Sequence, residues 1–162
     1  MSLTSVLDGL NQARVEYVVI GGVAAVFHGS ARNTFDIDIC YNPTDVNRER
    51  LAGLLVTWHA ELRGADPGLP FTIDGRTLRD VPVLTLKTAE DSFDVMDVVA
   101  GVGGYADVLK KSEAGTVAGV PTRVISLDAL IDAKRATRRR KDQEALLELE
   151  ALREIRKKKG LD

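Results

Sequence analysis

The chain has 162 residues, of which 44% are hydrophobic and 28% charged, and its formal net charge is −2. These values are typical of a folded globular protein and argue against disorder. The longest apolar stretch, residues 15–27, is interrupted by a glutamate and two glycines and is too short to cross a bilayer. Cys40 is the only cysteine, which excludes an internal disulfide and a cysteine-built zinc site. We expect one domain over residues 1–162, no membrane association, and a cytoplasmic location.

The basic residues are concentrated near the C-terminal end. Residues 134–159 contain 11 Lys or Arg against 5 Asp or Glu, whereas residues 1–133 contain 11 against 18. Such an asymmetry is typical of a surface that binds a polyanion, although a solvated helix face has the same composition.

The first residues predict a helix, a strand and a second short helix. Thr4 can cap a helix whose apolar positions recur at helical spacing, and residues 15–20 have the composition of a buried strand. Two glycines then break the strand, and residues 23–28 are small and apolar enough to form a helix that packs on a sheet.

Residues 35–40 alternate between apolar and polar side chains, which is the period of a strand. Asp36 and Asp38 therefore leave the same face, where their carboxylates can share hard divalent cations. Alone, Asp-x-Asp is a common and usually solvated pattern. Here the intervening residues are strongly apolar, so we expect a central strand whose carboxylates need partners.

The middle of the chain predicts a long helix and then two paired strands. Pro43 near its start and a row of leucines indicate a helix from residue 42 to about Arg63. Residues 81–88 and 92–99 have the composition of two strands joined by a polar turn.

The last third predicts a short helix, a hairpin and two longer helices. The short helix covers residues 105–111, and the hairpin covers residues 116–125 and turns at Gly119. Ser126 can cap the next helix, and a last amphipathic helix follows the basic cluster.

Together these elements predict an α/β (α+β) fold, in which a small mixed β-sheet is flanked by helices. We expect the core over about residues 4–125 and a basic, helical C-terminal segment over about residues 126–159.

Gly21-Gly22 lies between the first strand and the short helix that follows it. Without a Cβ, backbone N–H groups at such a turn can approach a phosphate closely. A glycine pair alone is equally typical of a tight turn. Arg32 and Thr34 follow shortly before the aspartate pair, so one short unit combines a phosphate cradle, a guanidinium and a metal-binding pair.

This stretch, VIGGVAAVFHGSARNTFDIDI, resembles the DNA polymerase β-like nucleotidyltransferase superfamily, in which a Gly-Gly or Gly-Ser turn precedes an Asp-x-Asp strand. More narrowly, it is similar to the abortive-infection (AbiEii-like) toxin branch of bacterial nucleotidyltransferases. The resemblance is strong over residues 15–42 and weaker over SFDVMDVVAGVGGY and VISLDALIDAKRATRRRKDQEAL. It implies a nucleotidyltransferase fold, Mg²⁺ (or Mn²⁺), and transfer of a nucleoside monophosphate from a nucleoside triphosphate such as ATP to an acceptor.

The superfamily uses a third carboxylate on a neighbouring strand. Asp94 and Asp97 are the candidates, and their spacing of three puts them on opposite faces of a strand. The resemblance favours Asp94 as the third metal ligand beside Asp36 and Asp38, and Asp97 is expected at the strand end or in a loop.

Lys134, Arg139, Lys141 and Asp142 match the branch's C-terminal pattern, in which basic groups hold phosphates. Lys134 is the preferred contact and is included with Asp36, Asp38 and Asp94 among the catalytic residues. Gly21, Gly22, Arg32, Thr34, Lys134 and Arg139 form the expected nucleotide site.

The resemblance leaves the acceptor open. It can be an RNA end, especially of transfer RNA, a protein hydroxyl, or a small molecule such as an aminoglycoside. The basic C-terminal segment favours RNA, and a cognate antitoxin or toxin is an expected partner. The alternative is a non-catalytic binding module or regulatory partner that keeps the fold without turnover.

Overall fold

The computed structural model of the chain describes residues 1–34, 36–66, 73–88, 92–137 and 139–160. Its helices are α1 (Leu3–Gln12), α2 (Gly21–Phe27), α3 (Asp45–Thr57), α4 (Gly75–Asp80), α5 (Tyr105–Lys110), α6 (Leu127–Ala136) and α7 (Arg140–Lys158). Its strands are β1 (Tyr17–Ile20), β2 (Asp36–Tyr41), β3 (Glu61–Leu62), β4 (Val83–Lys87), β5 (Ser92–Met96), β6 (Val98–Val99), β7 (Gly103–Gly104), β8 (Ser112–Val117) and β9 (Val120–Ile125).

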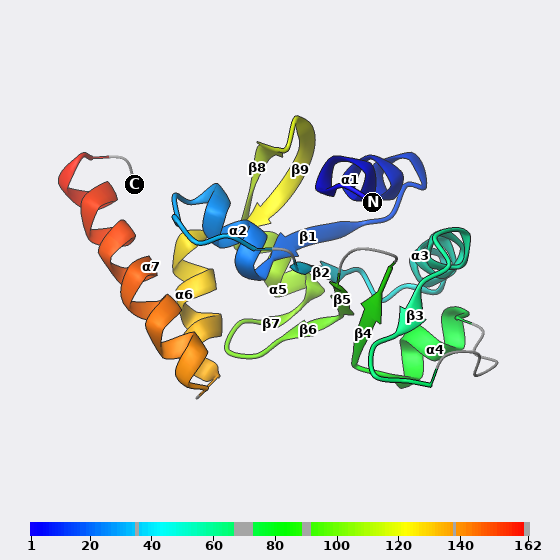
Figure 1. Cartoon of the computed structure of the whole chain (residues 1–162). Helices are drawn as coiled ribbons and strands as arrows, with labels where there is room; N and C mark the ends of the chain where they lie inside the picture. The colour runs from blue at the N-terminus through cyan, green and yellow to red at the C-terminus, as the bar shows by residue number, and fades with distance from the viewer. Residues whose placement is uncertain (35, 67–72, 89–91, 138, 161–162) are drawn as a thin grey trace.

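Seven of these strands form one mixed sheet in the order β3-β4-β5-β2-β1-β9-β8, with helices packed around it (Figure 1). β2 lies between β1, to which it is antiparallel, and β5, to which it is parallel. β1 is parallel to β9 on its other side. The predicted mixed sheet flanked by helices is confirmed, and β2 is central as its apolar residues required.

The odd-numbered residues of β2 build the hydrophobic core. Ile37, Ile39 and Tyr41 are at most 4% exposed. Their neighbours on β5 point the same way, and the ring of Phe93 meets that of Trp58, next to the end of α3, edge-on at 6.1 Å between centroids. This face of the sheet therefore contributes to the apolar burial that stabilises the fold.

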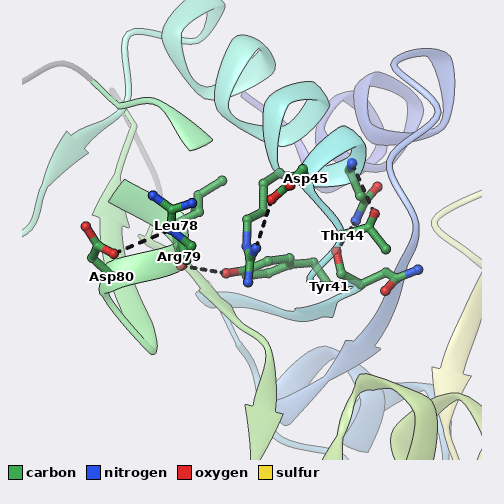
Figure 2. Close-up of polar contacts among 9 residues, drawn as sticks. Tyr41, Thr44, Asp45, Leu78, Arg79 and Asp80 are labelled. Atoms are coloured by element: carbon green, nitrogen blue, oxygen red, sulfur yellow. Dashed lines mark hydrogen bonds and ion pairs between the residues drawn. The ribbon is translucent and has the colours of Figure 1, made fainter. Parts of the chain in front are cut away.

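Polar contacts fix α3 and α4 to the end of β2 (Figure 2). The Tyr41 hydroxyl donates to the carbonyl of Leu78 in α4 at 3.0 Å. Thr44 caps α3 by accepting from the Asn47 backbone N–H. Because Tyr41 is buried, its hydrogen bond satisfies a hydroxyl that would otherwise be costly to bury.

Two sequence predictions near the N-terminus need correction. Ser2, not Thr4, caps α1, and the Thr4 hydroxyl instead donates to the carbonyl of Ala118 in the β8–β9 turn. The short helix also begins earlier than predicted, because Gly21 and Gly22 form its first turn. The strand over residues 35–40 is confirmed from Asp36 onward, and residue 35 lies outside the described residues.

The long helix predicted to reach about Arg63 is wrong at its C-terminal end. α3 ends at Thr57, and His59 adopts a left-handed conformation with φ of 53°. Glu61–Leu62 then pairs with β4 as an edge strand, so tertiary pairing overrides local helix propensity here. The sequence predictions also lacked α4, whose capping box is formed by Asp74 and Thr77.

The elements predicted for the last third are confirmed, except that the hairpin begins at Ser112 and not at residue 116. β8 and β9 form a hairpin whose turn residues, Ala118 and Gly119, have φ of 50° and 80°. These values suit a two-residue turn that matches the twist of the strands. Ser126 caps α6, and α7 packs along α6 (Figure 1). Among the helices of the described residues, none has both the length and the apolar character required to cross a membrane.

Candidate active site

Strand pairing brings two of the predicted carboxylates together. Asp38 on β2 is in register with Asp94 on the parallel neighbour β5, and Asp36 is in register with Ser92 one step earlier. Side chains in register on neighbouring strands leave the same face. Asp36, Asp38 and Asp94 therefore share one face, opposite to the face that carries Ile37 and Ile39.

Asp97 takes a different position. It follows β5 in a bend, and its charge raises the pKa of Cys40 and of Tyr41. Burial has the larger effect on both groups, and it takes the pKa of Cys40 to about 12. Cys40 is therefore an inert, protonated core residue at neutral pH.

The electrostatics of Asp38 are unfavourable in the absence of a cation. Burial, followed by the charges of Asp94 and Asp36, raises its pKa from 3.8 to about 6, and Lys134 offsets only part of this. Burial also raises the pKa of Asp94, against the lowering effect of Arg63. The crowded carboxylates thus repel one another, and a proton or a cation between Asp38 and Asp94 would relieve this repulsion.

Gly21 is required where α2 begins. Its φ is +66°, a conformation that side-chain-bearing residues rarely adopt, and a Cβ at this position would collide with the Asp38 carboxylate. A Cβ on Gly22 would lie 2.7 Å from the Thr34 hydroxyl oxygen. The glycine pair therefore lets the backbone of α2 pass directly against the carboxylate face.

The segment between α2 and β2 is held by polar contacts. The Thr34 hydroxyl accepts from the backbone N–H of Asp36 at 3.4 Å, which ties the segment to the start of β2. Arg32 lies 3.7 Å from a carboxylate oxygen of Glu148 on α7, and the Ser30 hydroxyl donates to that same oxygen. Thr34 and Arg32 line the same cavity as Asp36, Asp38 and Asp94, and their nucleotide-binding role stays a prediction. Glu148 is a neighbour that the sequence did not reveal.

Lys134 and Arg139 meet on the side chain of Asp142. The Lys134 Nζ lies 3.3 Å and the Arg139 Nε 2.8 Å from its two oxygens, and Asp142 is 1% exposed. Burial alone would raise the pKa of Asp142, but hydrogen bonds from Thr137 and Arg139 and the charge of Lys134 hold it below its ordinary value. Asp142 therefore positions both cations at the junction of α6 and α7.

Arg63 is a second neighbour that the sequence did not reveal. Its Nη2 lies 3.5 Å from the Asp94 carboxylate. Its backbone N–H donates to the carbonyl oxygen of Thr85 on β4. The sequence placed Arg63 at the end of a helix, and nothing local indicated that the β3–β4 pairing carries it to the carboxylates.

These residues line one cavity of about 470 Å³. Its walls come from α2, the segment after it, β2, β5, Arg63 and the α6–α7 pair. Its charged members are the cations Arg32, Arg63, Lys134, Arg139 and Lys141 and the carboxylates Asp36, Asp38, Asp94, Asp142 and Glu148. Of the predicted site residues only Gly21 is not in the lining, although it lies against Asp38.

The carboxylate face suits a hard divalent cation by its chemistry, because such ions prefer carboxylate oxygens. Within the described residues, however, no three His, Cys, Asp or Glu side chains converge into a preformed metal cluster. Asp36 is exposed at the start of β2, whereas Asp38 and Asp94 are half-buried. Asp38 and Asp94 therefore offer adjacent oxygen donors, with Asp36 at the exposed end of the same face, and the metal role of the three aspartates stays a prediction.

Solved structures share this arrangement of strands and helices. The chain matches the antibiotic-resistance factor ANT(2'')-Ia, solved with adenylyl-2''-tobramycin, with a TM-score of 0.57 and 16% identity over 97% of this chain and 95% of that one. It matches the lincosamide antibiotic adenylyltransferase LnuA, bound to lincomycin, with a TM-score of 0.61 and 15% identity over 93% and 95%. The chain has the nucleotidyltransferase fold.

A third match is an antigenic nucleotidyltransferase-like protein from Paracoccidioides brasiliensis, with a TM-score of 0.54 and 15% identity over 91% of this chain and 72% of that one. No protein-family model matches the sequence, and no curated protein matches it significantly. At identities this low the likeness concerns the fold, and the chemistry of the cavity has to be argued from its own residues.

Proposed function

We propose that this protein is a Mg²⁺-dependent nucleotidyltransferase that moves a nucleoside monophosphate from a nucleoside triphosphate to an acceptor hydroxyl. The observation that carries the proposal is the position of Asp38, which lies against Gly21 and in register with Asp94. The two aspartates line one cavity together with Lys134 and four further arginines or lysines. In this proposal the glycine pair is the phosphate cradle, and it adjoins the carboxylate face.

In this proposal Asp36, Asp38 and Asp94 hold the metal. Bound Mg²⁺ would neutralise phosphate charge and lower the pKa of the acceptor hydroxyl. Mn²⁺ would suit the same oxygen ligands.

The chain's own residues would bind and orient the triphosphate. The backbone of Gly21 and Gly22 would face the β- and γ-phosphates, and Lys134, Arg139 and Arg32 would offset the negative charge that develops on them. Each of these cations now contacts a carboxylate, Asp142 or Glu148, so a phosphate has to compete for it. Thr34 would keep the segment next to the cradle in place through its bond to Asp36.

The reaction would form a bond between the acceptor oxygen and the α-phosphorus and break the bond from that phosphorus to the bridging oxygen. Pyrophosphate would carry away the negative charge. The hydroxyl proton would pass to the carboxylate face, whose three aspartates line the cavity.

Two classes of acceptor have specific support. A small molecule is supported by the fold neighbours, since one was solved with adenylylated tobramycin and another with lincomycin. An RNA end, as in the abortive-infection toxins, is supported by the basic C-terminal segment, whose last helical turn contains Arg156, Lys157 and Lys158. In the RNA case a cognate antitoxin would be the expected protein partner.

A non-catalytic binding module is the second candidate function. The observation that favours it is the internal pairing of the cavity cations with carboxylates, which leaves fewer free charges for a triphosphate. Magnesium-dependent release of pyrophosphate separates the two candidates, because a binding module releases none.

The acceptor can be identified by labelling. Purified protein is incubated with each α-labelled nucleoside triphosphate, Mg²⁺ and a total cell extract, and the labelled product is separated into RNA, protein and small molecules. We expect label in one class with wild type and none with Asp36→Asn or Asp38→Asn. Equal labelling by these variants would show that the carboxylate face is not the catalytic site.

A further inference from the structure

Helix α7 carries a row of exposed apolar side chains on its outer side. Its inner side includes the buried residues Asp142 and Leu149, which line the cavity. On a helix of about 3.6 residues per turn, Leu147, Ala151 and Ile155 fall on the opposite stripe. Leu147 is 70% and Ile155 48% exposed, and Ala151 is exposed as well. These exposures mean that the described part of the chain leaves the stripe largely uncovered, and α7 itself lies at the edge of the molecule (Figure 1).

At its two ends the stripe has residues of opposite charge that form no ion pair with other described residues. Glu144 and Lys158 continue it at its two ends, and within the described residues neither has an ion-pair partner. By contrast, Glu150 and Arg153 on the flanks of α7 pair with Arg135 and Asp128 on α6. The charges that hold α7 to the body are thus separate from those that frame the stripe.

The sequence of the stripe is symmetric about Ala151. Leu147 and Ile155 lie four residues on either side of it, and Glu144 and Lys158 lie seven residues on either side. If a second α7 crosses the first in the antiparallel direction at Ala151, each leucine meets an isoleucine and each glutamate meets a lysine. The small alanine at the centre lets the two helices approach closely.

We propose that two copies of this chain associate through an antiparallel contact between their α7 helices, centred on Ala151. The contact is isologous, so a two-fold axis closes it at a dimer. One helix pair buries little area compared with a permanent interface, so the dimer is weak and depends on concentration. In this arrangement the basic last turn of the second copy lies beside residues 144–146 of α7, which follow Lys141, a residue of the cavity lining.

Sedimentation velocity of the full chain over about 1–500 µM tests the association. The mean mass is expected to rise from that of one chain towards that of two, and Leu147→Glu is expected to raise the dissociation constant by about tenfold or more. Leu147 is mostly exposed, so the variant should keep its fold, which circular dichroism verifies. If the wild-type chain stays monomeric over the whole concentration range, the proposal is wrong. This holds also if the stripe turns out to bind a different protein.

A charge exchange tests the antiparallel register. Glu144→Lys and Lys158→Glu are each expected to weaken the dimer several-fold, and the double variant is expected to restore it, because the opposite charges again face each other. Asp8→Lys, the same change of charge on an exposed position of α1, is the control and should leave the dissociation constant unchanged. Additive losses in the double variant would rule out this pairing.

Discussion

The two faces of strand β2 differ in what they contribute to the protein. Ile37, Ile39 and Tyr41 point into the core and are almost completely buried. Asp36 and Asp38 point into the cavity, where burial and neighbouring charges raise the pKa of Asp38 to about 6. One strand therefore places stabilising side chains on one side and mutually repelling side chains on the other.

This difference shows how the cavity depends on the core. Carboxylates that repel one another would separate if they stood on a mobile loop, but here the register of β2 with β5 holds Asp38 beside Asp94. Charged groups that are held close without a counterion cost stability and are typical of functional sites. Substitutions on the two faces should consequently have different effects.

The largest effect is expected from Asp38→Asn. The amide removes a ligand charge from the carboxylate face, so kcat/KM for nucleotidyl transfer should fall by about 10³-fold or more, equivalent to about 4 kcal/mol. The far-ultraviolet circular dichroism spectrum should stay unchanged. Asp97→Asn, outside β5, is the control and should retain activity within a factor of a few.

Ile39→Ala tests the opposite face. Ile39 is 0% exposed, so its truncation should lower the free energy of unfolding by about 2–5 kcal/mol through lost burial and the cavity it leaves. Urea denaturation measures this loss. Val46→Ala is the control: Val46 is 61% exposed, so the substitution should change the free energy of unfolding by less than about 0.5 kcal/mol. A large loss of kcat/KM in folded Ile39→Ala protein would contradict the separation of the two faces.

Gly21→Ala tests the point where α2 meets the carboxylate face. The methyl group would both strain the backbone at φ +66° and collide with Asp38. Gly64→Ala is a matched control, because Gly64 has φ of +84° but nothing within 4 Å of an added Cβ. Backbone strain should lower the free energy of unfolding of each variant by about 1 kcal/mol. In Gly21→Ala alone, the collision with Asp38 should lower it by about 1 kcal/mol more and should also reduce activity. Equal behaviour of the two variants would mean that the contact with Asp38 has no consequence.

The smallest effect concerns the stability of the metal-free protein. The pKa of Asp38 is about 6 in the folded protein, whereas its ordinary value is 3.8. The ionised carboxylate therefore destabilises the fold at a pH above about 6, and this loss of stability disappears as the pH falls from about 6 to 3.8. With EDTA present at about pH 7, Asp38→Asn should therefore be more stable than wild type by about 1–2 kcal/mol. This advantage should shrink towards pH 4, and urea denaturation at several pH values measures it. An advantage that does not change with pH would have a cause other than ionisation.

The sequence predicted the local features of the site better than its long-range ones. The alternation around Asp36 and Asp38 and the break of the strand at Gly21 are properties of adjacent residues. The structure shows strand β2 where it was expected and shows β1 ending at Ile20, although the glycines belong to the following helix. The register of Asp94 with Asp38 depends on which strands pair, for which only the family resemblance gave an indication.

Arg63 and Glu148 could not be predicted for the same reason. Arg63 reaches Asp94 because a two-residue edge strand forms where local propensity favoured a longer helix. Glu148 reaches Arg32 because α7 folds back over the segment after α2. Helix α4 was absent from the predictions because its six residues contain one buried leucine, Leu78, and so show no apolar periodicity.

The most direct test of the central claim measures the release of pyrophosphate. The protein is incubated with all four nucleoside triphosphates, Mg²⁺ and the class of acceptor that the labelling experiment identifies. Wild type and Asp97→Asn should release pyrophosphate in step with nucleotide transfer, and removal of Mg²⁺ with EDTA or the change Asp38→Asn should abolish both. If wild type binds a triphosphate but releases no pyrophosphate with any acceptor class, or if Asp38→Asn is as active as Asp97→Asn, the protein is not a nucleotidyltransferase acting through this carboxylate face.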